Sequence, residues 1–169
     1  MQRAILLQTL PTRSKQKRLT NFSREATALA KQLLAQRKGC RTFMAFHRNV
    51  YSASKRSTSF NAQVICDIER SVWRMKAKTA VKGITVKFNI PRNCARFAKS
   101  FEFVKLGTQP RNAVSIPVKP NRNLQRFQRL LNDGWECKTI GLTPRLELAA
   151  YCTKKEVPTP RRRNVLGID

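Results

Sequence analysis

The sequence has few acidic residues. It contains 9 Asp and Glu against 35 Lys and Arg in 169 residues, which gives a formal net charge of +26. The imbalance is not confined to one tail, because no acid occurs between Glu25 and Asp67 or between Glu69 and Glu102. A folded chain with this charge repels itself unless a polyanion neutralises it. Nucleic acid is therefore the partner that the composition favours over a merely solvated basic surface.

Histidine is almost absent, since His47 is the only one. The 5 cysteines are far apart and form no CxxC motif: Cys40, Cys66, Cys94, Cys137 and Cys152. This spacing argues against a zinc site within the chain. It also suggests no Ser/His/Asp or Cys/His catalytic arrangement. The cysteines are most simply small buried side chains of a protein in a reducing compartment.

Long hydrophobic runs are also missing. No stretch approaches the ~20 apolar residues of a membrane-spanning helix, and the apolar run 4–7 near the N-terminus is too short for the core of a signal peptide. An anionic membrane surface remains the other candidate for so basic a protein. We expect a cytoplasmic, nucleoid-associated protein with no membrane partner.

The spacing of the apolar residues predicts an α+β fold. Helical periodicity dominates the first half of the chain, and alternation with a period of two dominates the second half. The expected helices are 20–38, 41–52, 59–78 and 121–134, with a loop at 52–59. The expected strands are 4–9, 84–90, 101–106, 114–118, 135–140 and 146–152, of which the last two form a hairpin and the one containing Pro117 lies at an edge or a bulge.

This order predicts a small split β-barrel interrupted by a helical insertion. The first barrel strand occupies residues 1–12, the helical insertion 13–83 and the rest of the barrel 84–157. Residues 158–169 form a basic linker followed by the run Val-Leu-Gly-Ile-Asp. Such an apolar run ending on a carboxylate is typical of the first strand of an RNase H-like (RuvC) nuclease domain, here truncated after that strand.

The whole chain resembles the N-terminal part of the OrfB (TnpB) family of insertion-sequence transposon proteins, which are related to type V CRISPR effectors. The resemblance rests on Leu10-Pro11-Thr12 before a long helix and on the segment 61–76, NAQVICDIERSVWRMK. It also rests on the Pro and basic residues just before Gly167-Ile168-Asp169. The last of these motifs is the sharpest single match, and the others are similar mainly in their order.

The resemblance implies the nucleic-acid-binding part of an RNA-guided DNA endonuclease. In the family, the wedge domain (a split barrel) and the helical recognition insert bind a guide RNA and the target DNA. Asp169 would be the first catalytic, metal-binding carboxylate, and a complete nuclease domain would use Mg²⁺. Two-metal chemistry needs several carboxylates around metals about 4 Å apart. We therefore expect no catalysis by this chain unless a second chain supplies the rest of the site.

The expected contacts with nucleic acid are cations directed at backbone phosphates, which position the strand and carry little sequence information. Candidates occur in a basic turn, near the end of the third helix and in the linker: Arg13, Lys15, Lys17, Arg18, Arg70, Arg74, Lys76, Lys78, Arg161, Arg162 and Arg163. A helix dipole also stabilises cations near the C-terminal end of the helix. This is the structural alternative for the candidates near the end of the third helix. Tyr51, Trp73 and Trp135 are candidates for stacking on bases or, more simply, for burial in the core.

Two alternatives remain. A general basic RNA-binding structural protein of a ribonucleoprotein particle would have the same charge and size, but it would not need the Val-Leu-Gly-Ile-Asp run. An active metal-dependent nuclease would require a partner chain with the missing carboxylates, and its cleavage would depend on Asp169.

Overall fold

The computed structural model describes residues 1–76, 81–92 and 94–154. Within these ranges the chain is a mixed α+β protein, as expected from the sequence, and it has four helices and two antiparallel sheets. The helices are α1 (Arg13–Gln36), α2 (Phe43–Ser57), α3 (Ala62–Trp73) and α4 (Arg122–Asn132). The strands are β1 (Gln2–Leu7), β2 (Val86–Asn89), β3 (Ala95–Phe97), β4 (Phe103–Gln109), β5 (Asn112–Pro117), β6 (Glu136–Leu142) and β7 (Leu148–Thr153).

The larger sheet joins the two ends of the described chain. Its strand order is β1-β7-β6-β2, and all of its pairs are antiparallel. β1 pairs with β7 from Gln2 opposite Thr153 to Leu7 opposite Leu148. The predicted hairpin of the last two strands is confirmed by β6 and β7. The elements described between β1 and β2 are the helices α1, α2 and α3, so these helices are inserted between two strands of one sheet.

The smaller sheet has the order β3-β4-β5, and this places Pro117 on an edge strand as predicted. The chain after β1 connects the two sheets, because Leu10 N–H donates to the carbonyl of Pro117 at 2.9 Å. Thr9 forms a bridge with Val118 nearby. The other edges of the two sheets, β2 and β3, are also linked, because Cys94 N–H donates to the Asn89 carbonyl at 3.0 Å. The described strands form two linked sheets rather than one closed barrel.

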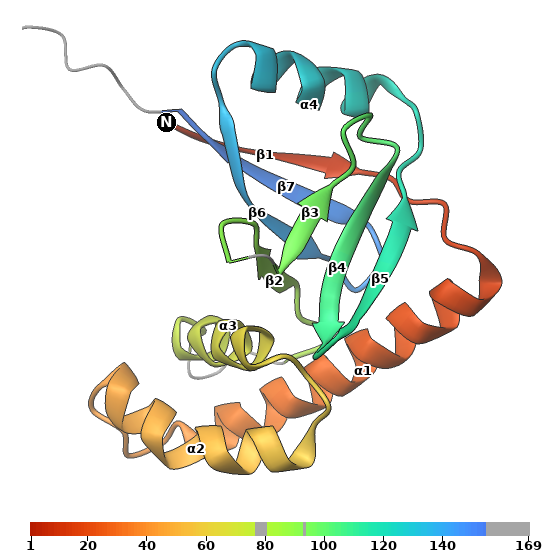
Figure 1. The fold of residues 1–169 in the computed structure, drawn as a ribbon. Coiled ribbons are helices and arrows are strands. Elements are labelled where there is room, and N and C mark those ends of the chain that lie inside the picture. Colours follow the sequence, from red (N-terminus) through yellow and green to blue (C-terminus); the bar gives the residue numbers. More distant parts are fainter. Residues whose placement is uncertain (77–80, 93, 155–169) are drawn as a thin grey trace, which may run out of the picture.

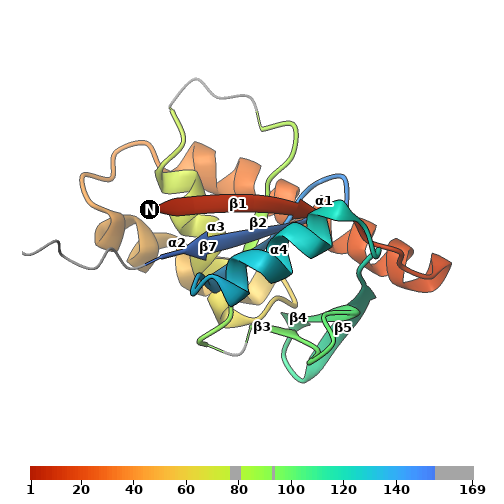
Figure 2. The same cartoon turned by 90° about the horizontal axis from the view of Figure 1, so that it is seen from above.

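The helices cover opposite sides of the strands. Figure 1 shows α1, α2 and α3 below the sheets and α4 above them, and Figure 2 shows α4 lying across β1 and β7. One hydrophobic core runs through the described residues. Phe88 of β2 is fully buried, and its ring centroid lies 5.9 Å from that of Phe22 on α1. Phe127 of α4 is equally buried, and it packs 5.0 Å from Phe97 of β3. Aromatic contacts thus tie both helical layers to the strands.

Several boundaries predicted from the sequence are wrong. α3 ends at Trp73 rather than at residue 78, because Arg74 caps the helix and its N–H donates to the Arg70 carbonyl. α1 begins at Arg13, because buried Leu19 continues the apolar stripe by one turn and no Gly or Pro interrupts it; the expected basic turn is therefore helical. α2 continues to Ser57 through the expected loop, where Ser54 Oγ donates to the Val50 carbonyl at 2.9 Å, a local bond that a helix tolerates. α3 begins only at Ala62, because the Asn61 side chain accepts from Gln63 N–H at 3.0 Å and caps the helix.

β3 has no counterpart in the prediction, since its three residues are too few to show a clear alternation. No helix in the described ranges is long and apolar enough to cross a membrane.

Candidate nucleic-acid interface

A hollow lined by cations lies between α3 and β2. Its volume is about 250 Å³, and its lining includes three basic side chains. α3 buries Val64, Ile68 and Val72 on one side, so Arg70 and Arg74 lie on the other. β2 buries Val86 and Phe88, which leaves Lys87 on the opposite face of the strand. The side chains that line the hollow are Asp67, Arg70, Ser71, Arg74 and Lys87.

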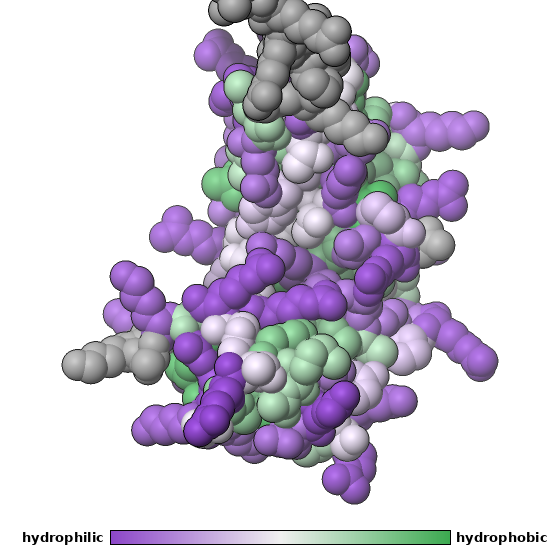
Figure 3. Space-filling view, turned by 90° about the vertical axis from the view of Figure 1, so that its left-hand side faces the viewer, coloured by the Kyte–Doolittle hydropathy of each residue, from purple (hydrophilic) through white to green (hydrophobic). Residues whose placement is uncertain are grey.

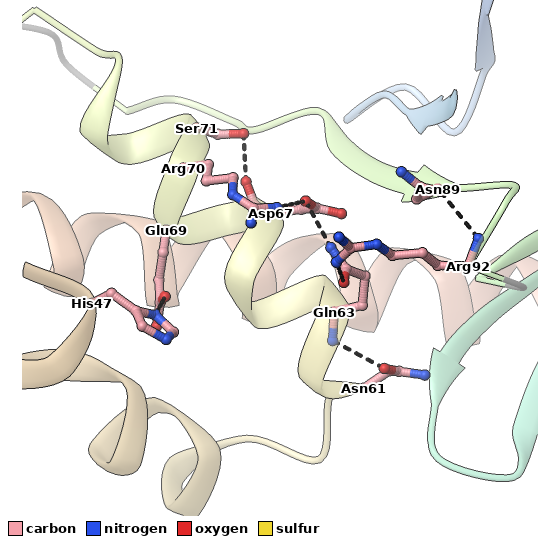
Figure 4. Close-up of polar contacts among 9 residues, drawn as sticks. All are labelled: His47, Asn61, Gln63, Asp67, Glu69, Arg70, Ser71, Asn89 and Arg92. Carbon is pink, nitrogen blue, oxygen red and sulfur yellow. Dashed lines mark hydrogen bonds and ion pairs between the residues drawn. The ribbon is translucent and has the colours of Figure 1, made fainter. Parts of the chain in front are cut away.

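A chain of hydrogen bonds holds one edge of this region together (Figure 4). Arg92, in the turn after β2, donates from Nη1 to Gln63 Oε1 at 2.7 Å, and its backbone N–H donates to Asn89 Oδ1 at 3.1 Å. Gln63 Nε2 donates in turn to Asp67 Oδ1 at 3.1 Å, and the same oxygen accepts from Arg70 Nη1 at 3.2 Å. Arg70 is therefore partly neutralised by Asp67. Arg92 is positioned beside α3 by an uncharged partner and keeps its full charge.

The first basic cluster, defined here as Arg13, Lys15, Lys17 and Arg18, lies on the first turns of α1. Lys15 is half-buried and the other three are exposed. No acid occurs in the first turn, and the side chain of the N-cap residue, Thr12, makes no capping bond. Cations near a helix N-terminus oppose the macrodipole, at a cost of about 0.3–1 kcal/mol each. The helix dipole therefore gives no stabilising reason for the cations of the first turn.

The loop between β4 and β5 adds another cation next to this cluster. Arg18 Nη2 donates to Asn112 Oδ1 at 2.8 Å, which holds the start of β5 against α1. Arg111 comes directly before Asn112, is exposed, and has a backbone φ of 58°. This left-handed conformation favours glycine and costs a larger residue about 1–2 kcal/mol. A cation thus occupies a position where the backbone would prefer glycine.

The structure does not bring the predicted clusters together. Arg18 and Arg37 are separated by about 28 Å along α1, given the helical rise of about 1.5 Å per residue. Arg37 marks the far end, because its Nη1 donates to the Val72 carbonyl at 3.1 Å and also to that of Met75. The first basic cluster and the basic end of α3 are thus two surfaces at opposite ends of one helix.

The remaining predicted contacts divide into two groups. Lys76 follows α3 and is exposed, as a phosphate contact requires. The others lie outside the described residues: Lys78, Arg161, Arg162, Arg163 and Asp169. The predicted nuclease strand and its metal ligand therefore stay predictions.

Of the aromatic candidates, Trp135 is buried, whereas Tyr51 and Trp73 are half-buried and pack against the core. Trp135 is only 7% exposed, and the Arg3 guanidinium sits 5.0 Å from its ring centroid. Trp73 is half-buried and stacks on Phe46 at 5.7 Å, with Arg37 at 5.4 Å from its ring. The core interpretation is confirmed for Trp135, which has no ring face available to a base.

Several basic positions were missed from the sequence. Lys87 could have been predicted, because it occupies a polar position in a strand where apolar and polar residues alternate. α4 has three exposed arginines at spacings of four and three residues, which places them along one side of the helix: Arg122, Arg126 and Arg129. Arg92 had no local signal, since only the packing of the turn against α3 brings it to Gln63 on that helix.

Basic side chains cover much of the surface that the structure describes. Figure 3 shows hydrophilic side chains projecting over the whole height of one face, with a small apolar area near its lower end. In the described ranges, ion pairs join Arg70 to Asp67 and Lys138 to Glu136, so only two Lys or Arg side chains there are paired with an acid. Phosphates of a bound nucleic acid would supply the missing counter-charge.

A third polar feature lies between α2 and α3. Glu69 is fully buried, and its Oε2 lies 2.5 Å from His47 Nδ1 (Figure 4). Burial raises the pKa of Glu69, and the hydrogen bond with His47 counteracts that shift. Cys66, one turn before Glu69, also has a pKa raised mainly by burial.

A scan against models of known protein families finds no match, and a search of curated proteins finds no relative.

Proposed function

We propose that this chain binds nucleic acid through backbone phosphates, as the binding part of a TnpB-like, RNA-guided DNA endonuclease. The observation that carries the proposal is the first basic cluster, which occupies the first turns of α1 with no acid in the first turn. Because cations are unfavourable at that end of a helix, an external anion is the simplest reason for them. The hollow between α3 and β2 provides a second surface of the same chemistry.

The arrangement of the elements supports the comparison with that family. β1 and β7 are neighbours in one sheet, and α1 to α3 lie between β1 and β2 in the chain. The edges of the two sheets are linked, as expected for a split barrel with a helical insertion. In this proposal the chain holds a guide RNA and the target DNA by shape and charge. Catalysis would require Mg²⁺, Asp169 and carboxylates supplied by another chain.

One observation favours the alternative of a general RNA-binding structural protein. The three arginines of α4 lie on the opposite side of the sheets from α1 to α3, so the charge is not restricted to one groove. A protein that coats RNA by charge alone would show this distribution.

Sequencing of the bound RNA distinguishes the two functions. The chain is expressed together with its flanking genomic DNA, purified, and washed at high salt. The TnpB-like proposal predicts that one structured RNA from the neighbouring locus stays bound. A random mixture that is lost as the salt rises would contradict guide binding and favour the general RNA-binding protein.

A further inference from the structure

The fold brings together three side chains of the types that bind transition metals. His47 comes from α2, and Cys66 and Glu69 come from successive turns of α3. Their ligand atoms all lie within 4.8 Å of one another. Since residues three apart on a helix share one face, α3 presents its thiol and carboxylate to the same side. The sequence has no CxxC or His-rich pattern that would predict this cluster, because its residues come from two different helices.

Glu69 is the unusual member of the cluster. Its side chain has no exposed area, yet Oε1 has no hydrogen-bond partner among the described residues. Oε2 alone contacts His47. A buried, unsatisfied carboxylate oxygen costs free energy unless a ligand completes its coordination. Arg70 is nearby in sequence, but its guanidinium pairs with Asp67 and leaves this oxygen without a partner.

The donor set indicates which ligand would fit. One imidazole nitrogen, one thiolate and one carboxylate oxygen are the usual ligands of Zn²⁺, with bonds of about 2.0–2.3 Å. Such bonds place neighbouring ligand atoms about 3.5 Å apart in a tetrahedron. The distance between His47 Nδ1 and Glu69 Oε2 would increase by about 1 Å, and the longer distances between ligand atoms would decrease by a similar amount. Changes of this size need only side-chain movements. The two negative ligands would balance the charge of the ion, and the Cys66 thiol would release its proton to solvent.

We propose that His47, Cys66 and Glu69 bind one divalent transition-metal ion of the zinc class, with solvent as the fourth ligand. His47 is 26% exposed at its side chain and Cys66 is half-buried, so the ion can enter from the surface. The ion would link α2 to α3 on the side of α3 away from the cationic hollow. This site is independent of the proposed nucleic-acid binding.

Metal titration of the reduced, metal-free full-length chain tests the proposal. We expect one equivalent of Zn²⁺ to bind in competition with a chelating dye. Co²⁺ should give a tetrahedral visible spectrum together with a thiolate-to-cobalt charge-transfer band. Cys66→Ser should weaken Zn²⁺ binding by at least about tenfold, the loss that even an outer-shell partner causes, and should remove the charge-transfer band.

Two further variants keep the test decisive. Cys137→Ser is the matched control, because Cys137 lies opposite Cys152 in the sheet and these two thiols could bind metal in place of the proposed site. It should bind Zn²⁺ like the original chain. His47→Gln keeps a hydrogen-bond donor for Glu69, so it should fold but lose the increase in melting temperature that Zn²⁺ causes in the original chain.

Three results would overturn the proposal. They are failure of the folded chain to bind stoichiometric Zn²⁺, a charge-transfer band unchanged in Cys66→Ser, and loss of binding in Cys137→Ser instead.

Discussion

The first basic cluster and the hollow between α3 and β2 contain similar charge in different settings. The cluster projects from the N-terminal end of a long helix, where the macrodipole disfavours cations and no acid is present in the first turn. In the hollow, Arg70 and Arg74 lie at the C-terminal end of α3, where the dipole favours them, and Asp67 pairs with Arg70. The first arrangement costs stability and the second contributes to it.

This difference separates a structural use of charge from a functional one. Arg70 would be expected at its position even without a ligand, because it bonds within its own helix. The charge on Arg13 and Lys17 has no such explanation. The first basic cluster is therefore the stronger evidence for an external polyanion, although the hollow has the more enclosed shape.

The largest expected effect is on the free energy of unfolding. It tests whether the first basic cluster and the hollow belong to one cooperatively folding unit. Phe88 is fully buried where β2 meets α1. Phe88→Ala should lower the free energy of unfolding by about 3–5 kcal/mol, because it removes a large side chain from a tight core. Denaturant unfolding followed by circular dichroism and by tryptophan fluorescence should show one shifted transition. Two transitions, with only one of them shifted, would mean that the helices and sheets unfold separately.

The next effect concerns the first basic cluster directly. The combined change Arg13→Glu, Lys15→Glu and Lys17→Glu should weaken RNA binding and reduce the salt slope by about 2, at ~0.7 per phosphate contact on a single strand. It should leave the melting temperature unchanged or raise it, because acids suit the start of a helix. Fluorescence anisotropy over a series of salt concentrations measures the slope, and thermal unfolding measures the stability.

A matched control carries the same change in net charge on three separate loops. Lys99→Glu, Lys119→Glu and Arg145→Glu alter exposed side chains that are not clustered. Their effect on the salt slope should be less than half of that of the cluster variant. Equal effects would show that RNA responds to net charge alone.

A smaller loss is expected from the hollow. Arg74→Gln with Lys87→Gln removes two of its three cations and leaves the Arg70–Asp67 pair intact. The salt slope should fall by about 1.4, and stability should fall by at most ~1 kcal/mol because Arg74 no longer favours the dipole of α3. Arg70→Gln alone should change RNA affinity less than Arg74→Gln alone. The reverse order would mean that Arg70 leaves Asp67 to bind RNA.

The smallest effect concerns the cation held in a left-handed conformation. Arg111→Gly should raise the free energy of unfolding by about 1 kcal/mol, because glycine adopts a positive φ without strain. The same change should weaken RNA binding by one phosphate contact, which reduces the salt slope by about 0.7. Arg111→Asn provides the comparison, since asparagine tolerates this conformation and removes the same charge. RNA binding that is unchanged in both variants would remove Arg111 from the interface.

The sequence predicts most of the elements but not their limits. The stripe from Phe22 to Leu33 and the alternation of residues 84–90 are local patterns, so α1 and β2 are found where expected. The ends of helices depend on capping and on local hydrogen bonds, such as the bond from Ser54 Oγ to the Val50 carbonyl. Such interactions are hard to predict from a sequence. For this reason α1 begins earlier, and α2 ends later, than the prediction places them.

The candidate sites were predictable only where their residues are neighbours in the chain. Arg70 and Arg74 are one turn apart on a helix, so the sequence places them together. Arg92 reaches Gln63 on α3 from the turn after β2, and His47 of α2 contacts Glu69 of α3. These contacts depend on the packing of distant segments, which local patterns do not encode.

The most direct measurement is to crosslink RNA to the original chain at physiological salt and map the attached peptides. We predict that crosslinks concentrate in residues 13–18 of α1 and at the cations that line the hollow, which are Arg70, Arg74 and Lys87. Crosslinks distributed over exposed Lys and Arg in general, including the loops of Lys99, Lys119 and Arg145, would contradict this prediction. That result would leave a protein that binds RNA through net charge alone.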